Sequence, residues 1–487
     1  MNQRMRRRGA APAARDGLPP MAGGVIGLTV LLSVVAAMLS PSGEIILACG
    51  LALCVIILLL WRKSEPPILL LPALFQWSEV SIWAYATAWR GTPLSMQSNY
   101  GANLDASTIY GLLGVVSLSV GMRLAMGKAR SGASFTERLR QEALSRSFDQ
   151  IALLAAAAIL AGYLASGVGR FAGGASQIFQ GFGQVKYIGI FALTYWSLVR
   201  GQKYPILIAV IAADIVVGLT GFFAQFKDVI LTVFVAALAA RPRIRASDAL
   251  LVGVAGGAIL VLATFWTAVK PEYRAILNRG TGAQEVTIPV SERIGYLVNR
   301  AINFDGTQFA EGFDGLVNRH GYTEFLGLVM AYVPEVVPHE NGRMTLDVLK
   351  HVAIPRAIWP GKPPLPNDTD VMAQYTGLPN AWDSNTSISI GHLGDLYIDF
   401  GWIGALMGMM CIGALTGRFY RKLRDYRGCS ALISAGLCLM IVLPIAYFGT
   451  AYIKLAGSFL MTVIAAFLTQ RQILKRLRAS IPGILPA

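Results

Sequence analysis

The sequence predicts an all-α, polytopic integral membrane protein with about twelve transmembrane helices and one large loop on the outer side. The chain has 487 residues, of which 54% are hydrophobic and 14% are charged, and its mean hydropathy is +0.54. A soluble domain usually carries about 25% charged residues, so this composition excludes that class. Apolar runs long enough to cross a bilayer recur along the chain, and the loops between them alternate in their content of lysine and arginine.

The apolar runs define the candidate spans. The first run follows a basic segment, as in a signal peptide, but it is long and the second run follows closely, so we interpret it as a retained helix. The runs at 187–200 and 228–241 are the shortest. The spans lie near residues 21–40, 44–61, 67–88, 107–126, 149–167, 187–200, 204–224, 228–241, 247–268, 392–416, 429–448 and 450–469.

The positions of the basic residues predict the orientation of the spans. With the N-terminus in the cytoplasm, the loops richest in lysine and arginine all fall on the cytoplasmic side. The net charge of +15 then follows from topology, and we expect no nucleic acid partner. The predicted organisation is a basic cytoplasmic segment at 1–20, helices 1–9 at 21–268, a large outer loop carrying the active site at 269–391, helices 10–12 at 392–470 and a basic cytoplasmic tail at 471–487.

Metal and disulfide chemistry is not expected. The five cysteines lie in or beside apolar spans, which argues against a disulfide framework and against a cysteine metal site. Asp368 and Asp370 form an Asp-x-Asp sequence, but it lies in a proline-rich loop that is not typical of a metal site. The sequence therefore predicts no metal and no cofactor.

The outer loop at 269–391 has the composition of a folded segment, because it is rich in aromatic and aliphatic residues. Loops of this length are usually functional or disordered, and this composition favours function. The apolar run at 321–337 is too short to span a bilayer and predicts a buried or interface-lying helix.

Cations and all four histidines gather in or beside this loop, against the positive-inside tendency. They predict an anionic ligand such as phosphate or pyrophosphate, which arginine binds as a fork and lysine as a point charge. The alternative is ordinary surface charge balanced by the acids of the loop. The candidate ligand contacts are Arg274, Arg319, Arg356 and Lys362.

The stretch PRAIWPGKPPLPND at 355–368 contains five prolines, which exclude a helix and favour a stiff, extended path. Such a path would present Arg356, Trp359 and Lys362 with little entropy to lose on binding. Trp359 would either anchor the loop at the lipid headgroups or stack on a sugar ring.

Two carboxylates, Asp395 and Asp399, lie four residues apart near the outer end of the tenth span. They either complement the helix dipole or supply a proton acceptor for a hydroxyl nucleophile, and Asp395 or His320 is the preferred acceptor. Ionisable residues inside the spans include Asp214 and Lys454, which could form a pair. A proton-coupled transporter would also use such residues.

The region 350–404 carries a family resemblance. Its features are the run from Arg356 to Pro363, then Asn367, and the sequence GDLYIDFGWIG at 394–404. Together they resemble the oligosaccharide repeat unit (O-antigen) polymerases of the Wzy type. Lys227, in GFFAQFKDVIL, matches a basic residue that this family tends to carry at the outer boundary between spans seven and eight.

Related O-antigen ligases carry an adjacent His-Asn pair before the equivalent of the tenth span. Here His392 and Asn385 are near each other but not adjacent, which favours a polymerase. The resemblance implies a fold of the GT-C type, with one large periplasmic loop between helices 9 and 10, in a bacterial inner membrane.

The implied activity joins a sugar hydroxyl of one lipid-linked repeat unit to the anomeric carbon of a glycan on undecaprenyl pyrophosphate. The implied partners are the lipid-linked oligosaccharide, the bilayer, a flippase and a chain-length regulator. A ligase and a lipid-linked oligosaccharide flippase are the alternatives. The expected catalytic residues are Arg356, Asp395 and His320, and the expected substrate contacts are Lys227, Arg274, Arg319, Trp359, Lys362, Asn367 and Asn385.

Overall fold

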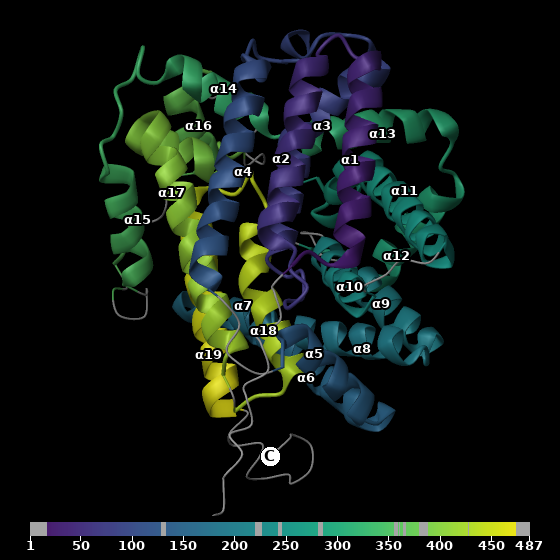
Figure 1. Cartoon of the computed structure of the whole chain (residues 1–487). Coiled ribbons are helices and arrows are strands. Elements are labelled where there is room, and N and C mark those ends of the chain that lie inside the picture. Colours follow the sequence, from purple (N-terminus) through teal and green to yellow (C-terminus); the bar gives the residue numbers. More distant parts are fainter. Residues whose placement is uncertain are drawn as a thin grey trace, which may run out of the picture.

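The fold is helical throughout the residues that the structure describes, and no strand occurs among them (Figure 1). The structure is a computed structural model. It describes residues 17–127, 133–219, 226–241, 246–280, 286–354, 359, 361–363, 367–378, 388–426 and 428–473.

The helices follow the predicted spans closely. In the first half of the chain they are α1 Pro20–Leu39, α2 Gly43–Leu60, α3 Leu70–Arg90, α4 Leu104–Met126, α5 Phe135–Ser145, α6 Phe148–Gly169, α7 Ser176–Gly183, α8 Lys186–Arg200, α9 Tyr204–Leu219 and α10 Phe226–Ala240. In the second half they are α11 Ala246–Leu277, α12 Val290–Ile302, α13 Gly306–His320, α14 Thr323–Tyr332, α15 Arg343–Ala353, α16 Asp368–Thr376, α17 His392–Arg424, α18 Ala431–Val442 and α19 Tyr452–Leu468. Short 3-10 turns η1 Leu94–Met96, η2 Gly173–Ala175 and η3 Leu443–Ile445 and the π-helical η4 Thr469–Ile473 complete the set.

The protein is a membrane-embedded helical protein. Each predicted span coincides with a helix, and six of the helices in the described ranges are long and apolar enough to cross a membrane: α1, α2, α4, α6, α17 and the helix that begins at Tyr452. Helices α8 and α10 have 15 residues each. A helix of that length extends only about 22 Å, less than the roughly 30 Å of a hydrocarbon core. The total of twelve spans therefore stays a prediction.

The closest helix pair is α4 and α17, which run side by side through the bundle (Figure 1). A Cβ atom added at Gly121 of α4 would lie 2.0 Å from the Met410 carbonyl oxygen. One added at Gly413 of α17 would lie 2.0 Å from the Leu118 oxygen, and Gly417 is similarly tight. Gly413 and Gly417 form the small-xxx-small spacing that lets membrane helices approach closely.

Helix α17 is broken near its start. Gly401 has φ 69° and ψ −167°, a conformation that favours glycine, so residues 392–400 form a short half and the rest a long half. The hydroxyl of Tyr110 on α4 donates to the carbonyl oxygen of Trp402 over 2.7 Å and so ties α4 to the residue that follows the break. The break aims the short half, with its two aspartates, away from the axis of the long half.

The segment 269–391 is folded into helices where it is described. Helix α14 is buried over most of its length, with Leu326 and Val329 fully inside the core, so of the buried or interface-lying helix predicted within 321–337 the structure shows the buried form. In Figure 1, α14 and α16 lie at the end of the bundle where α1 ends, and α15 lies along one flank.

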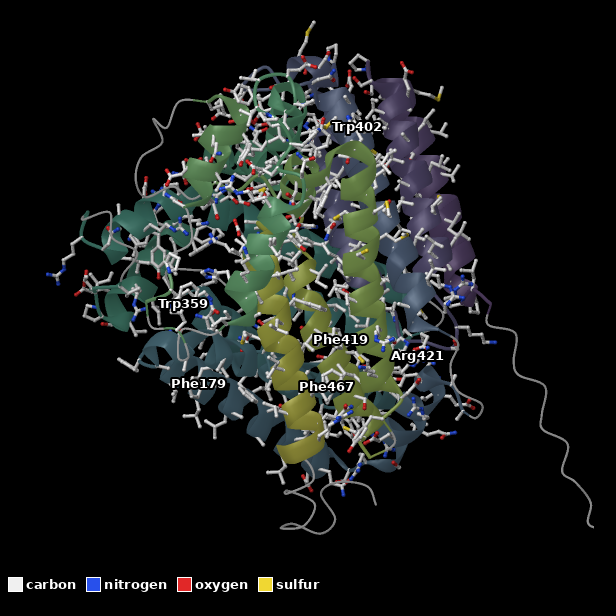
Figure 2. All side chains as sticks on the ribbon, turned by 90° about the vertical axis from the view of Figure 1, so that its left-hand side faces the viewer. Phe179, Trp359, Trp402, Phe419, Arg421 and Phe467 are labelled. Atoms are coloured by element: carbon white, nitrogen blue, oxygen red, sulfur yellow. The ribbon has the colours of Figure 1, made fainter. Side chains whose placement is uncertain are left out.

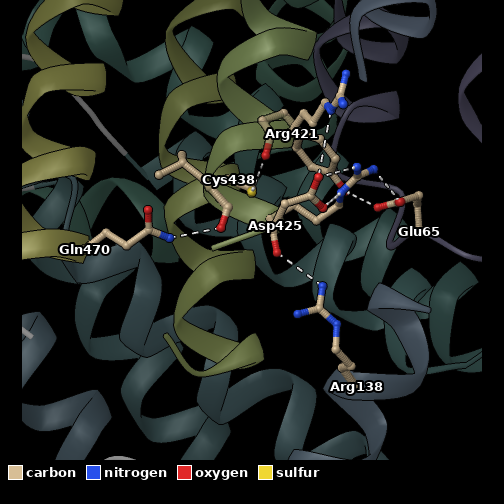
Figure 3. A network of polar contacts seen from close by, with 9 residues as sticks. Glu65, Arg138, Arg421, Asp425, Cys438 and Gln470 are labelled. Atoms are coloured by element: carbon tan, nitrogen blue, oxygen red, sulfur yellow. Dashed lines mark hydrogen bonds and ion pairs between the residues drawn. The ribbon is translucent and has the colours of Figure 1, made fainter. Parts of the chain in front are cut away.

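A buried ionic network fastens the opposite end of α17 (Figure 3). Arg424 is fully buried, and its guanidinium contacts Glu65 Oε1 at 2.6 Å and Asp425 Oδ1 at 2.8 Å. The Tyr420 hydroxyl donates to Glu65 Oε2 over 2.9 Å. The network therefore joins the α2–α3 connection to the end of α17.

Side chains from neighbouring segments also donate hydrogen bonds to backbone carbonyl oxygens at this end of α17 (Figure 3). Arg138 of α5 donates to the carbonyl oxygen of Arg424 over 3.2 Å, and Gln470 donates to that of Leu423 over 2.9 Å. The last turns of α17 are thus held from three sides.

Removing either member of the Arg424–Glu65 pair should destabilise the protein. We expect Arg424→Ala and Glu65→Ala each to cost about 3–5 kcal/mol, because each leaves an uncompensated buried charge. Thermal unfolding in detergent measures the effect. Arg421→Ala is the matched control, since Arg421 is half exposed and lies 3.9 Å from Asp425. Equal melting temperatures for the Arg424 and Arg421 variants would contradict this role.

Candidate functional site

Four basic side chains from three helices form a cationic cluster. They are Lys227 of α10, Lys270 and Arg274 of α11, and Arg319 of α13. Burial, and then the charges of Arg319, Arg274 and Lys227, lower the pKa of Lys270 to about 7. Burial and the charge of Arg319 also lower the pKa of Arg274. Helices α11 and α13 pack on each other, so their cations lie on neighbouring elements and repel one another.

Helix α11 positions Lys270 and Arg274 by burying its opposite, apolar face. Lys270 and Arg274 are one turn apart on α11, while Trp266, Tyr273 and Leu277 of the same helix are buried in a small core beside α12. The predicted ninth span ends at residue 268, so both cations lie beyond it.

Arg319 is placed by the packing of α13 on α3. The Trp83 indole donates to the carbonyl oxygen of Val317 over 3.1 Å, and Arg90 donates to the Asn318 side chain over 2.9 Å. These two contacts fix the last turn of α13, which carries Arg319 and His320.

The cluster is open to solvent. Lys227 and Arg319 are exposed, and Lys270 and Arg274 are partly exposed. Within the described part of the chain, no carboxylate forms an ion pair with Lys227, Lys270 or Arg319. Such a cluster suits a ligand with several negative charges.

One acid whose charge acts on the cluster is Glu79 of α3. Its carboxylate is buried and accepts a hydrogen bond from the backbone N–H of Phe448, and its charge acts on Lys227. The backbone N–H of Tyr322 donates to the Glu79 carbonyl oxygen over 3.0 Å. Glu79 thus ties α3 to the start of α14 and to the turn before α19, and it only partly offsets the four cations.

His320 lies beside the cluster. Its Nε2 is 2.8 Å from the Ser78 hydroxyl, and its ring meets Phe75 edge to face at 5.3 Å. Burial, and then the charge of Lys227, lower the pKa of His320 to about 4. The imidazole is therefore neutral and weakly basic near pH 7, which suits hydrogen bonding better than proton acceptance.

The two aspartates of the short half of α17 fasten other helices. Asp395 is buried and accepts from the backbone N–H of Tyr452, the first residue of α19, over 2.7 Å. Asp399 accepts from Gly342 and Thr345 over 2.8 Å each and from Met344 over 3.1 Å, all at the start of α15. Each carboxylate therefore satisfies backbone donors at the N-terminus of a helix other than its own.

The structure does not bring Asp395 to the cationic cluster. Its carboxylate binds the Tyr452 backbone N–H, and among the described residues no ion pair joins it to a cation. The sequence predicted that Asp395 complements the dipole of its own helix or accepts a proton. The contact that the structure shows, with the first residue of α19, could not be predicted because it joins residues 57 apart.

Lys362 is also held by a helix end. Its ammonium is buried and donates to the carbonyl oxygen of Ile354 over 2.9 Å and to that of His351, both at the end of α15. Trp359, by contrast, is 45% exposed, and Figure 2 shows it on the same flank of the molecule as Phe179.

The remaining predicted contacts either have another structural role or fall outside the described residues. Asn367 accepts from the backbone N–H of Thr369 over 3.4 Å and caps α16. Arg356 and Asn385 fall outside the described residues, as does most of the proline-rich stretch that holds Arg356.

A cavity of about 620 Å³ adjoins the cluster. We call it the α7–α19 cavity, because α7 and the first half of α19 form two of its walls; the end of α15, with Lys362, and the turn before α19 form others. The Asp228 carboxylate lies on this lining and accepts from Tyr447 over 2.6 Å and from Tyr187 over 3.3 Å. Since Asp228 follows Lys227 directly, the cavity and the cluster meet at the start of α10.

The pair predicted between Asp214 and Lys454 is wrong. Asp214 of α9 instead pairs with Lys186 of α8 at 3.1 Å, because the two helices pack together. Lys454 of α19 pairs with Asp368 at the start of α16. Among the described residues, no group of three or more histidine, cysteine or acidic side chains could hold a metal ion.

Sequence reasoning identified three of the four cations in the cluster but not Lys270. The signal was present, because Lys270 and Arg274 are separated by one helical turn just past an apolar run. Asp228 and Tyr447 gave no such signal, since nothing in the sequence joins residues 219 apart.

Anion binding at the cluster should weaken as pH rises through the pKa of Lys270, because the cation is lost above about pH 7. We expect the affinity for inorganic pyrophosphate, measured by calorimetry, to fall by up to about tenfold per pH unit relative to a Lys270→Arg variant. The variant keeps its charge, so the comparison cancels the ionisation of the ligand. Parallel pH profiles for the two proteins would exclude Lys270 from the site.

A comparison with protein families gives one match, to a model described as a domain of unknown function (DUF8712), over residues 74–476. The matched residues include the cationic cluster, the cavity and both aspartates of α17. Comparison with curated proteins and with solved structures finds no match.

Proposed function

The chain belongs to this family, DUF8712, and we propose that it is a lipid-pyrophosphate-dependent glycosyltransferase that polymerises oligosaccharide repeat units at the outer face of a membrane. The observation that carries the proposal is the cationic cluster, in which four basic side chains from α10, α11 and α13 lie near one another at a surface that solvent reaches. The polymerase resemblance at 350–404 supports the same reading.

The chemistry of the cluster fits a pyrophosphate leaving group. In the proposed reaction, a sugar hydroxyl oxygen attacks the anomeric carbon of a glycan on undecaprenyl pyrophosphate. The bond from that carbon to the pyrophosphate oxygen breaks, the hydroxyl proton passes to a base, and undecaprenyl pyrophosphate leaves. Because negative charge grows on the departing oxygen, cations aimed at it stabilise the transition state more than the ground state.

The position of the cluster fits a ligand anchored in lipid. Lys270 lies two residues beyond the predicted end of the ninth span, and Lys227 lies at the start of α10. The four cations come from segments that the charge pattern assigns to the same side of the membrane. A pyrophosphate at the surface of the bilayer would reach them while its isoprenoid tail stayed among the apolar helices.

Loss of a cluster cation should stop polymer formation without stopping export. In cells lacking the gene, we expect Arg319→Ala or Lys227→Ala to reduce the polymer ladder on a glycan gel by roughly 100-fold or more, as removal of one charge-stabilising donor does elsewhere. Arg356→Ala and Arg356→Lys test the proline-rich stretch in the same way.

The control for these variants is Arg343→Ala, because Arg343 is 78% exposed and lies at the start of α15. Single repeat units should still reach the surface in every variant. If export is lost together with polymer, a flippase is the better assignment, and if the ladder survives every cluster variant the polymerase proposal fails.

Residue 361 should be accessible from outside the cell. We expect a cysteine replacing the exposed Gly361 to react with an impermeant thiol reagent in intact spheroplasts, above the labelling of the five native cysteines. Ser145→Cys, in the predicted cytoplasmic loop, should react only after lysis. The reverse pattern would place the proposed site on the wrong side.

A further inference from the structure

We infer that the α7–α19 cavity is a binding site for uncharged sugar residues, adjoining the cationic cluster. The inference rests on the proposed function in one respect, because it takes the sugars to belong to the glycan whose pyrophosphate the cluster binds. The evidence lies in the side chains of the two facing helices, in their charge and in the place where the cavity meets the cluster.

The α7 wall is a stripe of amide and hydroxyl side chains. Gln177, Gln180 and Gln184 follow one another at spacings of three and four residues, which puts them on one face of the helix, and all three line the cavity with Ser176. Amide side chains both donate and accept hydrogen bonds. They therefore match sugar hydroxyls, which also do both.

The α19 wall repeats this pattern. Lys454, Ser458 and Thr462 are each one turn apart and line the cavity. The two helices cross where Gly181 of α7 lies against Met461, since a Cβ at Gly181 would be 2.8 Å from the Met461 carbonyl oxygen. On the open side of this crossing, Gly457 has no atom within 4 Å of an added Cβ.

The charges on the lining are already compensated. Lys454 is paired with Asp368, and the ammonium of Lys362 donates to carbonyl oxygens at the end of α15. Asp228 is the one carboxylate among the described lining residues, and both of its oxygens accept from tyrosines. The surface offered to a ligand thus combines neutral donors and acceptors with apolar side chains such as Ile178, Ile453 and Met461. This mixture suits a sugar, which has both hydroxyl groups and C–H faces, better than it suits an ion.

The size and position of the cavity agree with this ligand class. Its volume of about 620 Å³ lies within the range of roughly 300–1,000 Å³ usual for small-molecule sites. The Tyr447 ring lies 6.0 Å from the Lys227 ammonium while its hydroxyl donates to Asp228. One tyrosine therefore touches both sites, so a sugar in the cavity would lie next to a pyrophosphate on the cluster.

Filling the cavity should remove sugar binding and leave anion binding intact. Purified full-length protein in nanodiscs would be titrated with a panel of uncharged di- to tetrasaccharides, including the repeat unit of the polymer made by the host cells. We expect Gly457→Phe to weaken the best ligand by at least tenfold and Gln180→Ala by about threefold to tenfold. Both variants should bind inorganic pyrophosphate as the wild type does.

Matched controls exist for both substitutions. Gly27→Phe places the same side chain at an open position of α1, and Gln141→Ala removes an exposed glutamine of α5; neither should change saccharide binding. The inference is overturned if no saccharide binds the wild type, or if Gly457→Phe binds as the wild type does. Failure of the proposed function looks different, because the cluster variants would then leave the polymer ladder intact whatever the cavity binds.

Discussion

The close approach of α4 and α17 is the contact on which the rest of the structure depends. Glycines at 121, 413 and 417 bring the two backbones together where any side chain would collide with a carbonyl group. In a bilayer, such packing replaces the hydrophobic effect as the force between helices. Once α17 is fixed, its buried Arg424 secures one end, and Asp395 and Asp399 secure the starts of α19 and α15 at the other.

The candidate site is assembled from parts that this frame holds in place. Three helices deliver the four cations, and the turn before α19 delivers Tyr447, which links the cluster to the α7–α19 cavity. The cations oppose one another electrostatically, so they are held by packing of the surrounding apolar faces and not by mutual attraction. An arrangement of this kind is preorganised for a ligand that supplies the missing negative charge.

The sequence alone predicted the helices well and the site only in part. Apolar runs revealed the spans because burial in lipid dictates composition over some twenty residues. Arg274 and Arg319 could be selected because cations are unexpected in outer segments, and Lys227 because of the family resemblance. The roles of Asp395, Asp399 and Lys362 could not be predicted, since each side chain serves a helix end whose position is set by tertiary packing. The partners of Asp214 and Lys454 were mistaken for the same reason.

Gly401 divides α17 into two halves that pack against different parts of the protein. After Gly401, α17 belongs to the apolar bundle. The short half before it packs on α4 and also holds the starts of α15 and α19 through Asp399 and Asp395. Changes in the segment that covers this end of the bundle can therefore accumulate while the long half of α17 keeps its packing. Relatives of this chain can be expected to share a nearly invariant scaffold while diversifying what they recognise, much as antibodies vary loops on a constant framework.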